Sequence, residues 1–231
     1  MEYRKIVSPS LKDLFIQEIE EQILSEKLKI GEKLPPEREI AQNMNISRSV
    51  VNSGISEMER KGFLVTVPRQ GTYVADFKSH ATPDILVSIM KYGSLSHDYI
   101  RSTLEIREIF MCTAIEKAIP QMTDEQLCAL EEAFEAFSLS ASPAEGADCL
   151  CKIDCLLAEY SGNLLMPIIL ASFKKPNAML FERYLRLYGS ENMKERNRML
   201  LEQMKARDAA GAVQTMRESI LETLEGTRQI Y

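Results

Sequence analysis

Residues 34–75 constrain the fold of this 231-residue chain more than any other stretch. They read LPPEREIAQNMNISRSVVNSGISEMERKGFLVTVPRQGTYVA. Two prolines stiffen the approach to a short helix that begins at Glu37 and ends near Asn45. Ser47 is a good N-cap for a second helix over residues 48–61. The pattern therefore predicts two short helices joined by a tight turn.

A β-hairpin is expected directly after the second helix. Gly62 closes that helix, and the segments 63–67 and 72–75 are rich in β-branched and aromatic residues. Residues 68–71, Pro-Arg-Gln-Gly, have turn chemistry. Helix, turn, helix and hairpin in this order make a winged helix-turn-helix, whose second helix enters the DNA major groove N-terminus first.

An amphipathic helix is predicted ahead of this motif. Ser8 or Ser10 can cap it, Pro9 suits its first turn, and Gly31 is expected to end it. Its apolar stripe recurs every four residues and is formed by Leu11, Phe15, Ile19 and Ile23.

The start of the second motif helix carries side chains that can read bases. Arg48 can pair with guanine, Asn52 with adenine, and Ser49 with either. Arg38, on the preceding helix, and the wing tip at Arg69-Gln70 can reach phosphates or a groove. The core is expected on a different face of the reading helix, formed by Val51, Ile55 and Met58. The alternative interpretation is that the polar side chains are only solvated surface.

The same stretch resembles the DNA-binding domain of GntR-family bacterial regulators over residues 11–75. The family pattern runs LPSERELA, SRTTVREAL, G-L-[IV] and G-T-[FY]-V, and this chain has LPPEREIA, SRSVVNSGI, GFLV and GTYV. By this resemblance, DNA contacts fall to Arg38, Ser47, Arg48, Ser49, Arg69, Gln70 and Gly71.

The chain departs from the family pattern inside the reading helix. Asn52-Ser53 replaces the usual Arg-Glu, and Gly54 replaces an alanine. Because one arginine contact is lost, we expect the operator to differ from the usual family site. Glycine within a helix costs up to ~1 kcal/mol relative to alanine.

Net charge separates the two parts of the chain. The whole chain carries a formal charge of −6, but residues 1–78 hold equal numbers of acidic and basic residues. The excess acid therefore lies in residues 79–231. A neutral N-terminal part can still bind phosphates if its cations gather on one face, with modest and salt-sensitive affinity.

The rest of the chain shows helical periods and no convincing strand. Thr123 and Gln126 have the spacing of a capping box. Proline and glycine positions separate seven predicted helices, at about 84–92, 98–119, 123–137, 144–161, 164–187, 191–207 and 208–229.

We therefore predict a mainly α protein, an N-terminal winged helix-turn-helix followed by a C-terminal α-helical bundle. The predicted bounds are 1–76 for the DNA-binding domain, 77–83 for a linker and 84–231 for the effector-binding and dimerisation domain.

The helical part resembles the FadR-like branch of the family. The resemblance is carried by LEIREIFMCTAIEKA (104–118), IDCLLAEYSGNLLM (153–166) and MKARDAAGAVQTMRESI (204–220). Many members of this branch bind a divalent metal through one Asp and three His, with the effector's carboxylate completing the shell.

The metal ligands of that branch are replaced in this chain. Leu150 stands at the Asp position, and Asp154, Asn197 and Ser219 stand at the three His positions. One carboxylate, one amide and one hydroxyl are a poor set for zinc. The prediction is a site with no metal and no cofactor.

Two interpretations of these positions stay open. In one, Asp154, Asn197 and Ser219 line a polar pocket for an organic effector, and Arg107 pairs with its acidic group. In the other, they are satisfied core polar groups and Arg107 makes a structural salt bridge. An organic acid or an acyl-coenzyme A is the ligand class considered, the latter with Arg183 and Arg186 near its phosphates.

The leading functional prediction is a ligand-responsive transcription regulator, expected to be a repressor, that binds a pseudo-palindromic DNA operator as a homodimer. The chain shows no catalytic constellation, so we do not expect an enzyme. The alternatives are an α-helical enzyme, or a protein-interaction module whose winged helix no longer reads DNA. No secretion signal or membrane span is apparent, and five cysteines are expected to be free thiols, which predicts a cytoplasmic protein.

Overall fold

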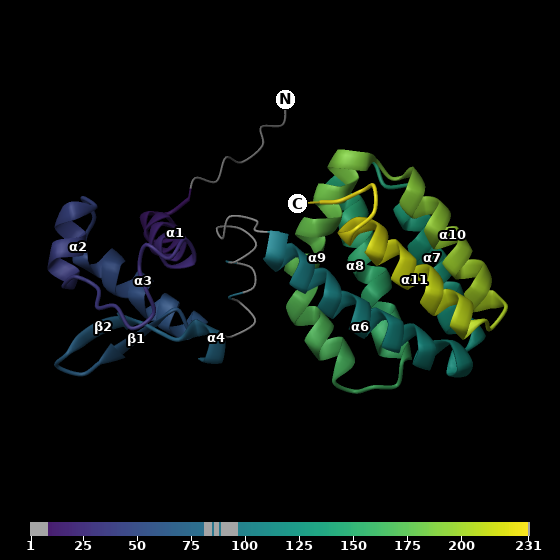
Figure 1. Cartoon of the computed structure of the whole chain (residues 1–231), viewed down its shortest axis with the longest axis horizontal. Coiled ribbons are helices and arrows are strands. Elements are labelled where there is room, and N and C mark those ends of the chain that lie inside the picture. The colour runs from purple at the N-terminus through teal and green to yellow at the C-terminus, as the bar shows by residue number, and fades with distance from the viewer. Residues whose placement is uncertain (1–8, 81–84, 86–87, 89–96, 231) are drawn as a thin grey trace, which may run out of the picture. The chain divides into compact units, whose positions relative to one another are not determined.

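The structure is a computed structural model that describes residues 9–80, 85, 88 and 97–230 (Figure 1). The chain divides into two compact units, residues 1–95 and 96–231. The stretch predicted as a linker begins with a short helix, α4 (Phe77–His80), and its remaining residues lie outside the described part. The helix predicted at 84–92 also lies almost entirely outside it.

The first unit contains the predicted order of elements. Three helices, α1 (Leu11–Leu24), α2 (Glu37–Asn43) and α3 (Arg48–Lys61), are followed by strands β1 (Leu64–Val67) and β2 (Gly71–Val74). The strands form an antiparallel hairpin, which is the wing. This confirms the predicted winged helix-turn-helix.

Helix α1 begins as predicted and ends earlier than predicted. Ser10 caps it, and Asp13 completes a capping box with the Ser10 backbone. The helix ends at Leu24, well before Gly31. Leu11 is 56% exposed because it lies in the first turn, beyond the reach of the core, so only part of the predicted stripe is buried. The buried members are Phe15, Ile19 and Ile23.

Helix α3 packs against α1 through a glycine. Val51, Ile55 and Met58 are buried as predicted. Gly54 lies on the same face, and a Cβ atom there would overlap the ring of Phe15 from α1. The close approach of the two helices therefore explains the glycine at a position where the resemblance implies alanine.

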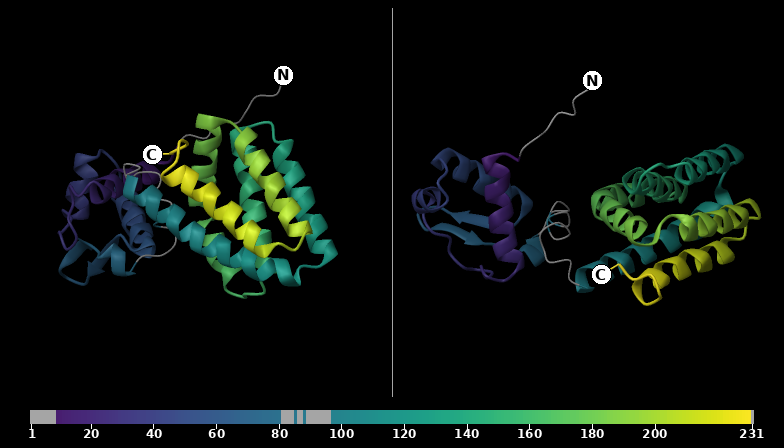
Figure 2. Two further views of the ribbon diagram at one scale, coloured as in Figure 1. Left: turned by 45° about the vertical axis from the view of Figure 1, so that its right-hand side comes forward. Right: turned by 90° about the horizontal axis from the view of Figure 1, so that it is seen from above.

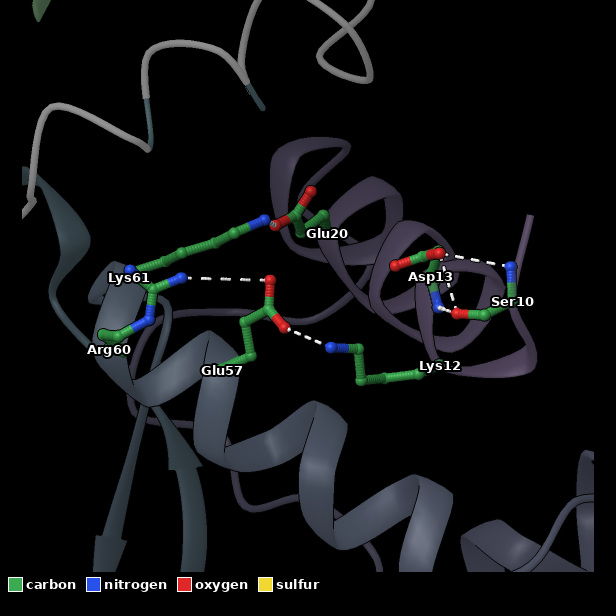
Figure 3. Close-up of polar contacts among 7 residues, drawn as sticks. All are labelled: Ser10, Lys12, Asp13, Glu20, Glu57, Arg60 and Lys61. Atoms are coloured by element: carbon green, nitrogen blue, oxygen red, sulfur yellow. Dashed lines mark hydrogen bonds and ion pairs between the residues drawn. The ribbon is translucent and has the colours of Figure 1, made fainter. Parts of the chain in front are cut away.

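Ion pairs flank this apolar contact (Figure 3). Lys12 Nζ lies 2.8 Å from Glu57 Oε2, and Lys61 Nζ lies 2.9 Å from Glu20 Oε1. Glu20 is fully buried, and its second carboxylate oxygen has no hydrogen-bond partner within the described residues. These pairs hold α1 on the C-terminal half of α3, so the N-terminal end of α3 remains exposed.

The second unit is built of helices throughout its described residues. The predicted helical bundle is confirmed. Figure 1 shows α6 (His97–Gln121), α7 (Asp124–Ser138), α8 (Pro143–Tyr160), α9 (Met166–Tyr188), α10 (Glu191–Lys205) and α11 (Ala209–Leu224).

Packing within the second unit pairs α8 with α9, and α6 with α11 (Figure 2). Thr123 and Gln126 form the predicted capping box of α7. Helix α6 continues through Pro120, and α11 ends at Leu224 instead of 229. The segment after α11 turns back, and Ile230 is buried, with its carbonyl 2.5 Å from Arg183 Nε.

Candidate nucleic-acid interface and ligand cavity

The exposed start of α3 is capped by Ser47. Its hydroxyl oxygen accepts a hydrogen bond from the backbone N–H of Val50 at 3.3 Å and lies 2.9 Å from the hydroxyl of Ser49. The remaining N–H groups of the first turn point out of the helix end, where the helix dipole favours negative charge. This end can bind a phosphate or approach base edges.

Two predicted arginines meet beside this helix end. Arg38 on α2 and Arg48 on α3 line one open surface hollow together with Gln42 and Asn45. Neither arginine forms a hydrogen bond or ion pair in the part of the chain that the structure describes. Their guanidinium groups are therefore available to an external anion.

Asn52 has a partner that the sequence did not suggest. Its side-chain amide donates a hydrogen bond to Glu37 Oε1 at 3.3 Å, which links α3 to the first turn of α2. Asn52 is exposed, and Glu37 is half-buried. Asn52 would have to exchange this bond for one to an adenine in order to read DNA.

The wing presents a further basic edge. Arg69 has a left-handed φ of +63° and Gly71 a φ of +123°, so the turn between β1 and β2 is tight. Lys33 forms an isolated bridge with Tyr73 and lies beside Gly71 at the wing. Sequence reasoning missed Lys33, because it lies outside the two helices and the hairpin and only strand pairing brings it there.

The second unit contains a cavity at the positions that resemble the family's metal site. It has a volume of about 50 Å³ and is lined from α6, α8, α9, α10 and α11 and by Ile230. Five positions named from the sequence lie at its wall or directly behind it. Arg107, Leu150, Asn197 and Ser219 line it, and Asp154 lies behind Arg107.

Arg107 and Asp154 form a buried ion pair. Arg107 Nε and Nη2 donate to the two Asp154 oxygens at 3.1 and 3.0 Å. The guanidinium carbon lies 4.8 Å from the centre of the Phe181 ring. Burial raises the pKa of the Asp154 carboxyl, and the guanidinium opposes that shift. The ion pair agrees with the interpretation in which Arg107 makes a structural salt bridge. The cavity agrees with the interpretation in which these residues line a pocket for an organic effector.

Two amide side chains at the cavity have buried polar atoms without partners among the described residues. They are Nδ2 of Asn197 and Oδ1 of Asn177. Asn177 on α9 is only 5% exposed. Sequence reasoning missed Asn177 and the neighbouring cation Arg196, because neither stands at a position that the family pattern marks.

The residues present do not suit a metal ion. Across residues 9–80, 85, 88 and 97–230 no group of three or more His, Cys, Asp or Glu side chains is placed to hold one. The single carboxylate of the site, Asp154, is occupied by Arg107. No helix of the described ranges is long and apolar enough to cross a membrane.

Two family models match this chain. Residues 13–74 match the model described as bacterial regulatory proteins, gntR family, and residues 102–222 match the FCD domain. The chain belongs to the GntR family. Its FCD domain is the helical bundle that contains the cavity, and its GntR domain is the winged helix.

Similar proteins within this family are transcription regulators. NanR of Enterobacter sp. (strain 638), a transcriptional repressor, is 27% identical over 148 residues, which cover 60% of this chain and 54% of NanR. The transcriptional regulator Mce2R of Mycobacterium tuberculosis is 33% identical over 110 residues, covering 46% and 45%. The chain thus spans about half the length of the curated relatives it matches.

Two solved structures share the fold. Lar of Listeria monocytogenes, which controls expression of the agr system, matches with a TM-score of 0.64 at 18% identity, covering 95% of this chain and 97% of its own. Streptococcus agalactiae GntR matches with a TM-score of 0.52 at 19% identity, covering 94% and 100%. At these identities the likeness concerns the fold alone.

Proposed function

We propose that this GntR-family chain is a cytoplasmic, DNA-binding transcription regulator, a repressor, whose operator affinity is modulated by a small organic ligand in the cavity of its FCD domain. The single observation that carries the DNA-binding part is the hollow beside the start of α3. There Arg38 and Arg48 lie together, exposed and without ion pairs among the described residues.

The chemistry of this surface fits duplex DNA. A helix N-terminus and two exposed guanidinium groups attract phosphates, and arginine also pairs with the O6 and N7 atoms of guanine in the major groove. Arg69, Gln70 and Gly71 at the wing tip would contact the backbone or the minor groove. Ser47 and Ser49 would donate from the start of α3, while Asn52 would read a base only after releasing Glu37.

The direct test is Arg48→Ala. In a homodimer the contact disappears from both half-sites, which costs about 2–6 kcal/mol at the usual strength of a bidentate arginine–guanine pair. Specific binding to the promoter of the protein's own operon should therefore be lost, as measured by fluorescence anisotropy at several salt concentrations. Unchanged affinity and footprint would show that α3 is not the reading helix.

Arg60→Ala is the matched control. Arg60 has the same side chain on the same helix, but it lies in the last turn, beside Glu57. Its loss should leave the operator affinity within about threefold, since only non-specific charge changes. The same titration separates the proposal from an enzyme or an interaction module, because neither alternative requires sequence-specific, salt-dependent binding.

A homodimer is part of the proposal, and an apolar surface on α6 and α9 supports it. The rings of Phe110 and Phe173 lie 6.4 Å apart and join the two helices. Ile109 and Ile168 on these helices are 62% and 64% exposed. Exposed apolar residues on two helices that contact one another are typical of protein interfaces.

Sedimentation velocity of the double variant Ile109→Asp/Ile168→Asp tests the dimer surface. The variant should be monomeric at concentrations where the unaltered protein is dimeric, because charges are buried at the interface. Leu139→Asp is the control, since Leu139 is 76% exposed at the end of α7, outside this surface. An unaltered sedimentation coefficient for the double variant would place the interface elsewhere.

A further inference from the structure

The ion pair of Arg107 limits what this arginine can offer to a ligand. Two of its nitrogens are bound to both oxygens of Asp154, so the pair carries no net charge. A ligand carboxylate beside Arg107 would also approach the Asp154 carboxylate. Arg107 is therefore placed to hold the wall of the cavity and to donate its remaining N–H groups to a neutral acceptor.

A second arginine lines the same cavity and has no such partner. Arg196 lies on the inner face of α10 with Met193, Asn197 and Leu200. It forms no hydrogen bond or ion pair within the described residues. Glu222 is close enough to sense its charge, but that carboxylate is already bound to Thr227 and Arg228.

The charge of the cavity is therefore positive. No Asp or Glu is among the side chains that line it, and Arg107 is neutralised from behind by Asp154. Arg196 supplies the one uncompensated charge of the lining that the structure describes. A partly buried cation of this kind favours an anionic ligand.

Unpaired polar atoms lie on the same cavity. Asn197 follows Arg196 directly on α10, and its Nδ2 donor is buried without a partner among the described residues. Asn177 faces the cavity from α9 with a buried, unpaired Oδ1 acceptor. Buried polar groups of native proteins are normally hydrogen-bonded, so these two atoms can each bind a polar group that enters the cavity.

We propose that Arg196, and not Arg107, pairs with the acidic group of a compact ligand in this cavity, while Asn197 and Asn177 hydrogen-bond the ligand's neutral polar group and Arg107 acts as a positioning residue. This inference rests on the proposed function, whose ligand class it names. The volume of about 50 Å³ fits a small acid, whereas an acyl-coenzyme A would need a far larger space.

The test uses acetate as the probe, acetamide as its uncharged isostere, and sodium chloride at matched ionic strength. Acetate should raise the Tm of the full chain in a saturable way, by about 5–10 °C at a hundredfold excess over its Kd. Acetamide and chloride should not. An acetate effect that does not saturate, or that acetamide reproduces, overturns the proposal.

Two variants identify the residue. Arg196→Gln should fold, because its guanidinium makes no hydrogen bond or ion pair with the described residues, and should no longer respond to acetate. Arg198→Gln, an exposed neighbour paired with Glu195, should keep the full response. If Arg196→Gln destabilises the fold, Arg196→Met is measured instead. A retained acetate response in either Arg196 variant contradicts the assignment. No DNA is present, so failure here leaves the operator-binding test untouched.

Discussion

The two units differ in how closely their helices pack. In the winged helix, α1 and α3 close directly on one another, with Phe15 lying against the bare backbone of Gly54. In the FCD domain, five helices leave a cavity beside a buried ion pair, and two amide side chains at its wall have buried polar atoms without a partner among the described residues. A closed core presents a reading helix in one rigid position, whereas an unfilled polar cavity leaves stability to be gained when a ligand binds.

The largest effect is expected from Asp154→Ala. It leaves the guanidinium of Arg107 buried without its partner, which should lower the free energy of unfolding of the FCD domain by about 3–5 kcal/mol. Urea unfolding followed by circular dichroism measures this change. Asp148→Ala, an exposed acid on the same helix, should change little. A loss below about 1 kcal/mol would show that the pair is not buried as described.

Gly54→Ala should destabilise the winged helix although alanine is the better helix former. The added methyl group overlaps the Phe15 ring, and overpacking of this kind costs about 1–3 kcal/mol, more than the ~1 kcal/mol gained in helix propensity. Ser53→Ala, on the exposed side of α3, is the control and should be neutral. Adding Phe15→Leu to Gly54→Ala should recover part of the loss in thermal unfolding; no recovery would exclude the steric explanation.

Asn197→Leu should raise stability while removing ligand response. The side chains are similar in size, and an unpaired buried amide carries a penalty of about 1–3 kcal/mol, so a gain near ~1 kcal/mol is expected. Asn192→Leu provides the contrast, since Asn192 donates to Tyr184 at 3.1 Å and its loss should destabilise. If both variants lose stability equally, Asn197 has a partner in solution.

The smallest effect is expected from the pH dependence of the Lys12–Glu57 ion pair between α1 and α3. The hydrogen bond from Lys12 holds the pKa of Glu57 below its ordinary value of 4.5. The pair therefore contributes stability above that pH and loses it as pH falls through the folded-state pKa. The Tm difference between the unaltered protein and Glu57→Gln should shrink on acidification. A difference that is constant with pH would exclude this ion pair as its source.

Local signals allowed much of the winged helix to be predicted. Ser47 caps α3, Gly62 ends it with a left-handed φ of +91°, and the hairpin follows, as expected from short-range chemistry. The predicted end of α1 was wrong because no strong stop signal precedes Gly31. The chain leaves the helix at Ser25, and Lys33 then forms a strand bridge with Tyr73 of the wing. The sequence showed that glycine replaces alanine at position 54, but only the contact with Phe15 explains it.

The two candidate sites differ in how much of each could be predicted from the sequence. Arg38 and Arg48 were named from a motif that places them ten residues apart, and the structure brings them to one hollow. At the cavity, the family pattern indicated Arg107 and Asn197. It gave no reason to expect that Arg196 would pair with the acidic group of a ligand. That choice depends on which arginine already has a partner, and the partner of Arg107 lies 47 residues away in the chain.

The sequence by itself determined the classes of element, the winged-helix order and the absence of histidine from the family's metal positions, because caps, turns and residue identity are local properties. Only the tertiary structure decided that Phe15 requires Gly54, that Asp154 neutralises Arg107, and that Arg196 lines the cavity without an ion-pair partner among the described residues. These facts depend on distances between helices that are far apart in the chain. The net charge and the free volume around a buried side chain are set by its neighbours, which the residue itself does not reveal.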